Sequence, residues 1–408
     1  MQYKEVAGGI CAPKGFAAAG VHCGIRANHS EKYDLALIKA EVRCAAAGVY
    51  TTNKVCGAPI KVDRAHLADG YAQAIVVNSG NANTCAANGV ALAEECCTLV
   101  GKALNIDEKD VLPASTGVIG QPMVIDPFAR GIPAAAEKLA ATAQGSTDAA
   151  TAIMTTDTHK KEYAIQFELG GKVCTVGAIG KGSGMIAPNM ATMLAFYTTD
   201  AAVSPALLEK ALKTVVPGTY NQMSVDLDTS TNDTCVLFAS GKAAAASAPL
   251  AGEDSVLYAE FCQALNAVTQ KLARKMASDG EGATKLVTVT VRGAANDAEA
   301  DLAARTVANS PLVKTAIYGH DANWGRIAGA LGRSGAKFAQ ENVDIDIMGM
   351  PVLRDGLPVP FSEEEALRRF EADEIVLEAS LGAGDAETTV WTCDFSHEYV
   401  SINGDYRS

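Results

Sequence analysis

The chain contains 408 residues, 48% of them hydrophobic, and carries a formal net charge of −13. This length allows a large core or two domains, and the acidic excess argues against nucleic-acid or anionic-membrane partners, which need clustered Lys and Arg. Eleven cysteines without CxxC spacing predict reduced, mostly buried thiols in a cytoplasmic protein. The sequence shows neither a signal-peptide pattern at its start nor an apolar run of about twenty residues, so no membrane span is predicted.

The first half reads as strands joined by glycine-containing turns, with helices between them. Strands are predicted over 42–50 and 72–77, and a helix over 86–104. Alternating apolar residues over 163–169 and 172–176 predict a hairpin that turns at Gly170-Gly171.

The second half carries the clearest helical pattern. Six apolar residues recur at spacings of three and four, namely Leu257, Phe261, Leu265, Val268, Leu272 and Met276. This helix should end at the glycines of 279–282, before a strand over 286–291 and a helix over 298–317. Ser362 followed by three glutamates predicts a further helix start. The mixture of helices and strands predicts an α/β or α+β fold.

The common signatures of phosphate, metal and hydrolase sites are absent from the sequence. It has no Walker or GxGxxG loop, no HExxH and no GxSxG, and its six histidines are isolated. We therefore expect no metal and no organic cofactor. What remains is a set of polar, mostly glycine-containing blocks beside apolar strands, each of which would be an ordinary turn if taken alone: 115–117, 155–158, 181–184, 224–234, 279–282 and 402–405.

Taken in order, these blocks resemble one family. GAIGKGSGMIAPNMATML with the following TTD, then SVDLDTSTND, SDGEGATK, NWGRI and INGDYRS, is similar to the ornithine acetyltransferases of arginine biosynthesis, also called glutamate N-acetyltransferases. The resemblance runs from ICAPKGF near the start to the last residue. It implies a layered α/β/β/α sandwich, assembled from two fragments of a self-cleaved precursor.

The resemblance also implies where the precursor is cut. The hydroxyl of Thr192 attacks the carbonyl of Ala191, and an acyl shift with hydrolysis leaves fragments 1–191 and 192–408. A threonine hydroxyl is a weak nucleophile, and the freed α-amine, with a pKa of roughly 7.7–8.0, supplies an adjacent base. Such fragments pair as α and β chains and double to a heterotetramer. Without the resemblance, Thr192 reads as a buried hydroxyl in an apolar strand.

Further site residues follow from matched positions. Thr116 and Gly117 match the oxyanion hole, through a hydroxyl and a backbone N–H. Lys181 matches a substrate contact and suits a carboxylate, while Thr155 and Glu281 match further contacts. Each has a structural alternative, because turns and solvated lysines are common in such loops.

Residues near the C-terminus complete the predicted contacts. Asn403 and Ser408 match substrate-binding positions, although a fraying tail is the alternative for Ser408. Asp226, Asp228 and Asp233 either support the site or cap turns, and the pattern favours turn caps.

The implied reaction is acetyl transfer in two steps. N-acetylornithine donates acetyl to Thr192 and ornithine leaves, and glutamate then accepts the acetyl group as N-acetylglutamate, with ping-pong kinetics. A bifunctional member would use acetyl-CoA as a second donor. The alternatives are an aminopeptidase or amidohydrolase in which water is the acceptor, and a non-catalytic binding protein that kept the fold.

The sequence departs from the usual family pattern at four positions. Leu227 stands where glycine is usual, His320 and Ala322 replace arginine and proline, and Gly404 replaces a common alanine. These changes affect the expected geometry of loops rather than the nucleophile.

Overall fold

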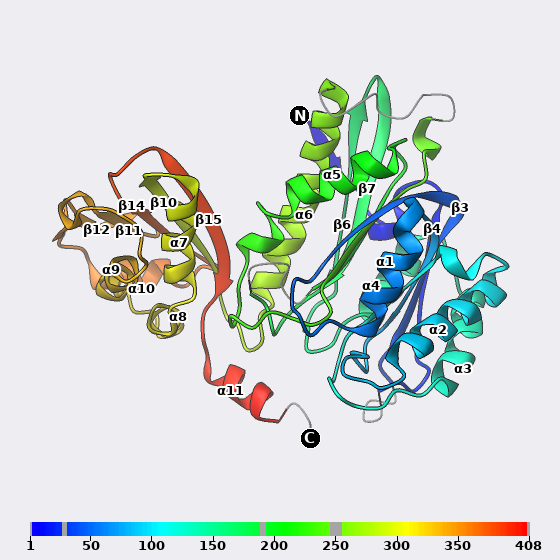
Figure 1. The fold of residues 1–408 in the computed structure, drawn as a ribbon. Coiled ribbons are helices and arrows are strands. Elements are labelled where there is room, and N and C mark those ends of the chain that lie inside the picture. Colours follow the sequence, from blue (N-terminus) through cyan, green and yellow to red (C-terminus); the bar gives the residue numbers. More distant parts are fainter. Residues whose placement is uncertain (1, 27–30, 188–192, 245–254, 406–408) are drawn as a thin grey trace. The chain divides into compact units, whose positions relative to one another are not determined.

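The structure, a computed structural model, describes residues 2–26, 31–187, 193–244 and 255–405 (Figure 1). It divides into two compact units. Unit 1 comprises Met1–Gly182, Asn189–Asn221 and Asp228–Leu272, and unit 2 comprises Ser183–Pro188, Gln222–Leu227 and Ala273–Ser408. Each unit is built on its own sheet.

Unit 1 holds a nine-stranded sheet in the order β1-β6-β7-β8-β9-β3-β4-β5, with β2 paired to β3. Its strands are β1 (Tyr3–Glu5), β2 (Phe16–Val21), β3 (Leu35–Tyr50), β4 (Tyr71–Asn78), β5 (Val111–Ser115), β6 (Lys161–Leu169), β7 (Lys172–Lys181), β8 (Leu194–Thr199) and β9 (Thr234–Ala239). Its helices are α1 (Ala58–His66), α2 (Gly89–Leu104), α3 (Asp126–Glu137), α4 (Ala143–Ala152), α5 (Pro205–Val215) and most of α6 (Val256–Ser278).

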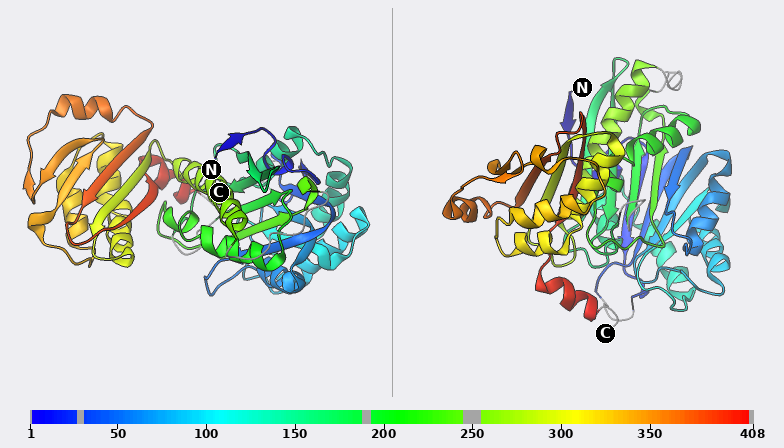
Figure 2. Two further views of the ribbon diagram at one scale, coloured as in Figure 1. Left: turned by 90° about the horizontal axis from the view of Figure 1, so that it is seen from above. Right: turned by 60° about the vertical axis from the view of Figure 1, so that its left-hand side comes forward.

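The long strand β3 divides this sheet into two facing layers. Its first part pairs with β2 and β4, and its last residues pair with β9. One core cluster joins Ile38 and Ile75 to Phe196 and Phe238, so strands of both layers pack face to face. A second cluster covers the opposite face of β3 and β4 with residues of α1, α2 and α3. Figures 1 and 2 show α5 and α6 on the side away from α2 and α3. The predicted α/β/β/α sandwich is therefore confirmed.

Segments on both sides of the predicted cut form this sheet together. Strand β7 precedes residue 191, and strands β8 and β9 follow it; β8 pairs antiparallel with β7 and parallel with β9. The predicted division into 1–191 and 192–408 concerns cleavage, and it differs from the division into compact units.

Unit 2 holds a six-stranded sheet in the order β13-β12-β11-β14-β10-β15. Its elements, yellow to red in Figure 1, are β10 (Leu286–Ala294), α7 (Asp297–Ala308), α8 (Pro311–Tyr318), α9 (Trp324–Gly332), β11 (Asp344–Ile347), β12 (Met350–Arg354), β13 (Leu357–Pro358), α10 (Glu363–Arg369), β14 (Glu374–Ser380), β15 (Ala386–Cys393) and α11 (His397–Gly404). A separate core cluster packs the sheet against its helices.

Most predicted elements are present. The hairpin 163–176 forms as β6 and β7, and its turn residues Gly170 and Gly171 have φ values of 58° and 76°, which only glycine adopts readily. Helix α6 buries five of its six predicted apolar residues, leaving Leu257 36% exposed. The Ser362 side chain caps α10 as predicted. Within the described residues, no helix is both long enough and apolar enough to cross a membrane.

The prediction of one helix over 298–317 is wrong. The chain forms α7 and α8 instead, separated at Asn309 and Ser310. Pro311 has no N–H to continue the helix, and the Ser310 hydroxyl accepts the backbone N–H of Val313 to begin a new one.

The unusual residue Leu227 lies in left-handed backbone. Its φ is 72°, a conformation that costs about 1–2 kcal/mol for a residue with a side chain. Its side chain is 57% exposed, so it contributes little packing in return. This backbone explains why glycine suits the position.

We predict that Leu227→Gly is more stable than Leu227→Ala, because glycine removes the strain of left-handed backbone. The free energy of unfolding should differ by up to about 1 kcal/mol, and Leu227→Gly should unfold at the higher temperature. Both variants lose the leucine side chain, so their difference isolates the backbone effect. Equal thermal unfolding of the two variants would show that position 227 carries no strain.

Candidate active site

The structure places the predicted site residues in two groups. Thr116, Gly117, Thr155 and Lys181 belong to unit 1, whereas Glu281 and Asn403 belong to unit 2. The remaining predicted residues, namely Ala191, Thr192 and Ser408, lie outside the described part of the chain.

Thr116 and Gly117 follow the last residue of β5. The backbone N–H of Thr116 is bonded to the carbonyl of Asn78 at 2.9 Å. Gly117 has a φ of 127°, and a Cβ there would lie 2.6 Å from the Gly80 carbonyl carbon, so only glycine fits. Among the described residues, neither the Thr116 hydroxyl nor the Gly117 N–H has a hydrogen-bond partner. Two adjacent donors are thus available for an oxyanion.

Asn232 holds this turn in place. Its amide Nδ2 donates to the carbonyl of Ser115 at 3.0 Å and to the carbonyl of Ala82 at 2.6 Å. Its Oδ1 accepts from the Thr84 hydroxyl at 2.7 Å. Asn232 is itself 6% exposed, so these bonds replace water inside the core. This role could not be read from the sequence, because Asn232 belongs to a block more than a hundred residues after Ser115.

The next residue, Asp233, reaches the segment that follows position 192. Its Oδ1 accepts the backbone N–H of Met193 at 2.9 Å, and the Met193 carbonyl accepts from Thr234 N–H at 3.1 Å. Asp233 is fully buried, and its Oδ2 has no hydrogen-bond partner within the described residues. The favoured interpretation of Asp233 as a turn cap is wrong, because its carboxylate binds a backbone N–H that lies 40 residues earlier in the sequence.

Asp226 also makes a long-range contact. In unit 2 its carboxylate accepts the backbone N–H groups of Met185 and Ile186, at 2.7 and 2.9 Å. These bonds hold the segment after the glycine-rich block, which lies 40 residues earlier in the chain.

Lys181 ends β7 and belongs to a buried cluster of charges. Lys181 is 3% exposed, and its neighbours Lys161 and Asp157 are 2% and 8% exposed. Asp157 accepts Lys161 Nζ at 2.6 Å and the N–H groups of Gly182 and Thr155 at 2.8 and 3.0 Å. A buried lysine beside this loop suits an anionic substrate group.

The pKa values of the two buried aspartates move in opposite directions. Burial opposes the ionisation of Asp157, but Lys181 and Lys161 outweigh it and hold the pKa of Asp157 well below its usual range. Burial also dominates at Asp233, where it raises the pKa well above the usual range despite the Met193 N–H and Lys181. Asp157 is therefore the firmly charged member of the pair.

A pocket of about 410 Å³ opens beside this cluster in unit 1. Its lining includes Thr155, Asp157, Met154 and Arg26. The Arg26 guanidinium donates to the carbonyl of Ser79 at 2.8 Å and also to the carbonyl of Met154. Arg26, which the sequence did not single out, ties the Thr155 loop to the segment preceding Gly80.

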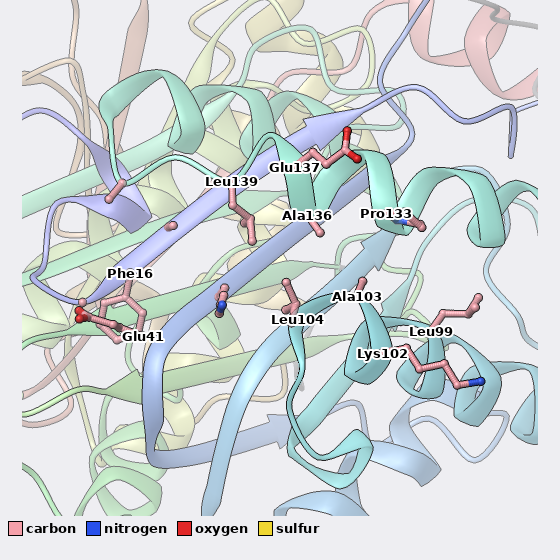
Figure 3. A pocket seen from close by; sticks show the side chains of 14 residues that line it. Phe16, Glu41, Leu99, Lys102, Ala103, Leu104, Pro133, Ala136, Glu137 and Leu139 are labelled. Carbon is pink, nitrogen blue, oxygen red and sulfur yellow. The ribbon is translucent and has the colours of Figure 1, made fainter.

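A larger groove of about 850 Å³ lies elsewhere in unit 1 (Figure 3). Phe16, Leu99, Leu104 and Leu139 give it an apolar lining, and Lys102 is among its charged residues. None of the predicted site residues lines it, so it has no place in the predicted chemistry.

In unit 2, Glu281 follows α6 and is 7% exposed. Its backbone N–H donates to the Ser183 carbonyl at 3.0 Å, and its carboxylate accepts Asn403 Nδ2 at 2.8 Å. Gly282 has a φ of 70°, and a Cβ there would lie 2.5 Å from the Tyr399 backbone nitrogen. The Glu281 turn and α11 are therefore closely packed.

The chain matches the ArgJ family model over residues 17–408. It is 48% identical over 404 residues, 99% of both chains, to the arginine biosynthesis bifunctional protein ArgJ of Symbiobacterium thermophilum, and 42% identical over 405 residues to that of Listeria monocytogenes, again covering 99% of both.

Two solved structures are also similar. The ArgJ protein of Bacillus halodurans is 44% identical, with a TM-score of 0.49, over 51% of this chain and 97% of that one. Ornithine acetyltransferase of Mycobacterium tuberculosis, solved with ornithine, is 34% identical, with a TM-score of 0.42, over 46% of this chain and 98% of that one.

We predict that Asp157→Asn costs about 3 kcal/mol at neutral pH, because it removes the buried carboxylate that pairs with Lys161. The lowered pKa of Asp157 means that its stabilisation is complete above about pH 4 and disappears as pH falls further. Urea unfolding across pH should therefore show the two proteins converging in acid. Asp107→Asn, at an exposed carboxylate, is the control; a pH-independent loss in Asp157→Asn would contradict the prediction.

For Asp233 we predict the opposite pH dependence. Asp233→Asn keeps an oxygen for the Met193 N–H, whereas Asp233→Ala leaves that buried donor unpaired and costs about 1–3 kcal/mol. Because the pKa of Asp233 is raised, wild type loses stability as pH rises above about 4, and Asp233→Asn should gain on it. The same urea series measures this; equal slopes against pH would contradict it.

Proposed function

Because this chain belongs to the ArgJ family, we propose that it is a glutamate N-acetyltransferase of arginine biosynthesis that moves acetyl from N2-acetyl-L-ornithine to L-glutamate through an acetylated Thr192. The family match over nearly the whole chain carries this proposal. The paired free donors at Thr116 and Gly117 support it, since acyl transfer needs such a site.

The first event is self-cleavage. The Thr192 hydroxyl adds to the Ala191 carbonyl carbon, the peptide C–N bond breaks, and the acyl group passes from nitrogen to oxygen. Water then hydrolyses this ester, leaving a carboxylate on Ala191 and a free α-amine on Thr192. The products are chains of 191 and 217 residues.

Acetyl transfer then uses the new amine as a base. It accepts the hydroxyl proton while Thr192 Oγ attacks the acetyl carbonyl of N-acetylornithine. Thr116 Oγ1–H and Gly117 N–H would donate to the oxyanion, and one such donor is worth about 3 kcal/mol of barrier. The departing amine takes the proton, and ornithine leaves.

Glutamate completes the cycle. Its neutral α-amine attacks the acetyl ester, and Thr192 Oγ leaves with a proton, which regenerates the hydroxyl and releases N-acetylglutamate. Donor and acceptor use one nucleophile in turn, so the kinetics are ping-pong.

Substrate binding is assigned to charges already described. The buried cation of Lys181 suits a substrate carboxylate, and the Glu281 carboxylate suits an ammonium group. Thr155, Asn403 and Ser408 are proposed as further contacts. No metal or organic cofactor is part of this scheme.

Two finer assignments extend the proposal. The relatives are called bifunctional, which supports acetyl-CoA as a second acetyl donor to Thr192. We also propose that the α and β chains form a heterotetramer, two of each, in the cytoplasm.

We predict that Thr192→Ala abolishes both cleavage and acetyl transfer, because the nucleophile is lost. Intact mass should show a single 42.2 kDa chain for the variant and two chains for wild type. Thr192→Ser, which keeps a hydroxyl, is the matched control and should still cleave. Wild type is then incubated with N-acetylornithine and glutamate, with and without acetyl-CoA, and N-acetylglutamate is measured by mass spectrometry.

Two outcomes would overturn the assignment. Transfer by Thr192→Ala would exclude the nucleophile. Release of free acetate without N-acetylglutamate would indicate an amidohydrolase or aminopeptidase that uses water as acceptor.

A further inference from the structure

The Glu281 carboxylate lies directly against the backbone of Gly184. A Cβ on Gly184 would be 2.3 Å from the Glu281 carboxyl carbon and from Oε2, and 2.4 Å from Oε1. Gly184 is not among the residues with left-handed backbone, so alanine is allowed there by conformation. What this glycine supplies is the space that a side chain would fill.

Asn403 holds the same carboxylate from another element, α11. Its Nδ2 donates to Glu281 Oε2 at 2.8 Å and to the Tyr399 carbonyl at 3.0 Å, which fixes the amide on its helix. The resemblance predicted a substrate contact for Asn403. This bond also gives Asn403 an influence on the substrate through Glu281.

The carboxylate keeps unused capacity for hydrogen bonds. Within the described residues, Asn403 Nδ2 is the only side-chain donor recorded for Glu281, although a carboxylate has about four lone-pair sites. A nearly buried carboxylate with one neutral partner is suited to a cation that brings several donors, and an ammonium brings three.

We infer that Gly184 and Asn403 are positioning residues that set the Glu281 carboxylate to bind the side-chain ammonium of the acetyl donor. This inference rests on the proposed function. N-acetylornithine has its α-nitrogen in a neutral amide, so its side-chain ammonium is its one cation. The missing side chain at position 184 leaves the space that the Glu281 carboxylate occupies, and the hydrogen bond from Asn403 determines the orientation of that carboxylate.

The contact at Gly184 makes a specific prediction about function and stability. In Gly184→Ala the new Cβ meets the movable end of a side chain, so Glu281 can rotate away at small cost to folding. The displaced carboxylate loses Asn403 and its alignment with the ammonium. We expect the KM for N-acetylornithine to rise about tenfold or more, as for loss of a hydrogen bond to a charged group. The KM for glutamate and the unfolding temperature should change little.

Two further variants separate positioning from a structural effect. Gly404→Ala is the matched control and should behave as wild type, because, apart from its chain neighbours and its own helix backbone, no atom of the described residues lies within 4 Å of a Cβ added there. Gly184→Ala combined with Glu281→Asp shortens the acid by one methylene and makes room for the Cβ. The double variant should bind ornithine more tightly than Gly184→Ala does, measured by calorimetry on the full protein.

The outcomes separate the inference from the proposed function. If wild type transfers acetyl but Gly184→Ala has the same KM for N-acetylornithine as Gly404→Ala, the inference is wrong and the function stands. Absence of rescue by Glu281→Asp would also overturn it. If wild type makes no N-acetylglutamate, the proposed function fails, and calorimetry with ornithine still tests the positioning of Glu281.

Discussion

The active-site region of unit 1 depends on two adjacent side chains, Asn232 and Asp233. The Asn232 amide holds the carbonyl of Ser115, immediately before Thr116, and the Asp233 carboxylate holds the N–H of Met193. Both side chains are buried, so water cannot take over either bond. This dipeptide, immediately before β9, thereby fixes the donors after β5 relative to the start of β8. The separation between the predicted oxyanion donors and Met193 is therefore set by the core rather than by flexible loops.

The electrostatic environment shifts the pKa values of two buried acids in unit 1, Asp157 and Asp233, in opposite directions. Asp157 has two lysine partners and stays charged, whereas Asp233 has one backbone donor and favours its neutral form. Lys181 acts on both carboxyl groups, but only at Asp157 do the nearby positive charges outweigh the cost of burial.

Local patterns in the sequence predicted most of the fold. The period of α6 and the glycine turn between β6 and β7 follow from neighbouring residues, which is why both were found. The break before Pro311 was readable from the proline and its serine cap, but the apolar period over 298–317 concealed it.

The site was less accessible to sequence reasoning. Thr116, Gly117, Lys181 and Glu281 came only from matched motifs. Asn232 and Gly184 act on residues far away in the chain, through contacts that exist only once the fold has formed. Spacing along a sequence carries no record of such contacts. Polar blocks that look like separate turns in the sequence are joined by hydrogen bonds in the folded chain.

The position of β8 bears on the order in which folding and the proposed cleavage take place. This strand lies between β7, which precedes the predicted cut, and β9, which follows it, and it is an inner strand of the sheet. An inner strand cannot be withdrawn without breaking hydrogen bonds on both its edges. Under the proposed mechanism the cut would therefore follow folding of the whole chain, and fragments 1–191 and 192–408 would stay joined through the hydrogen bonds between β7 and β8. Such a cut would change the chemistry of residue 192 while the sheet kept its strand order.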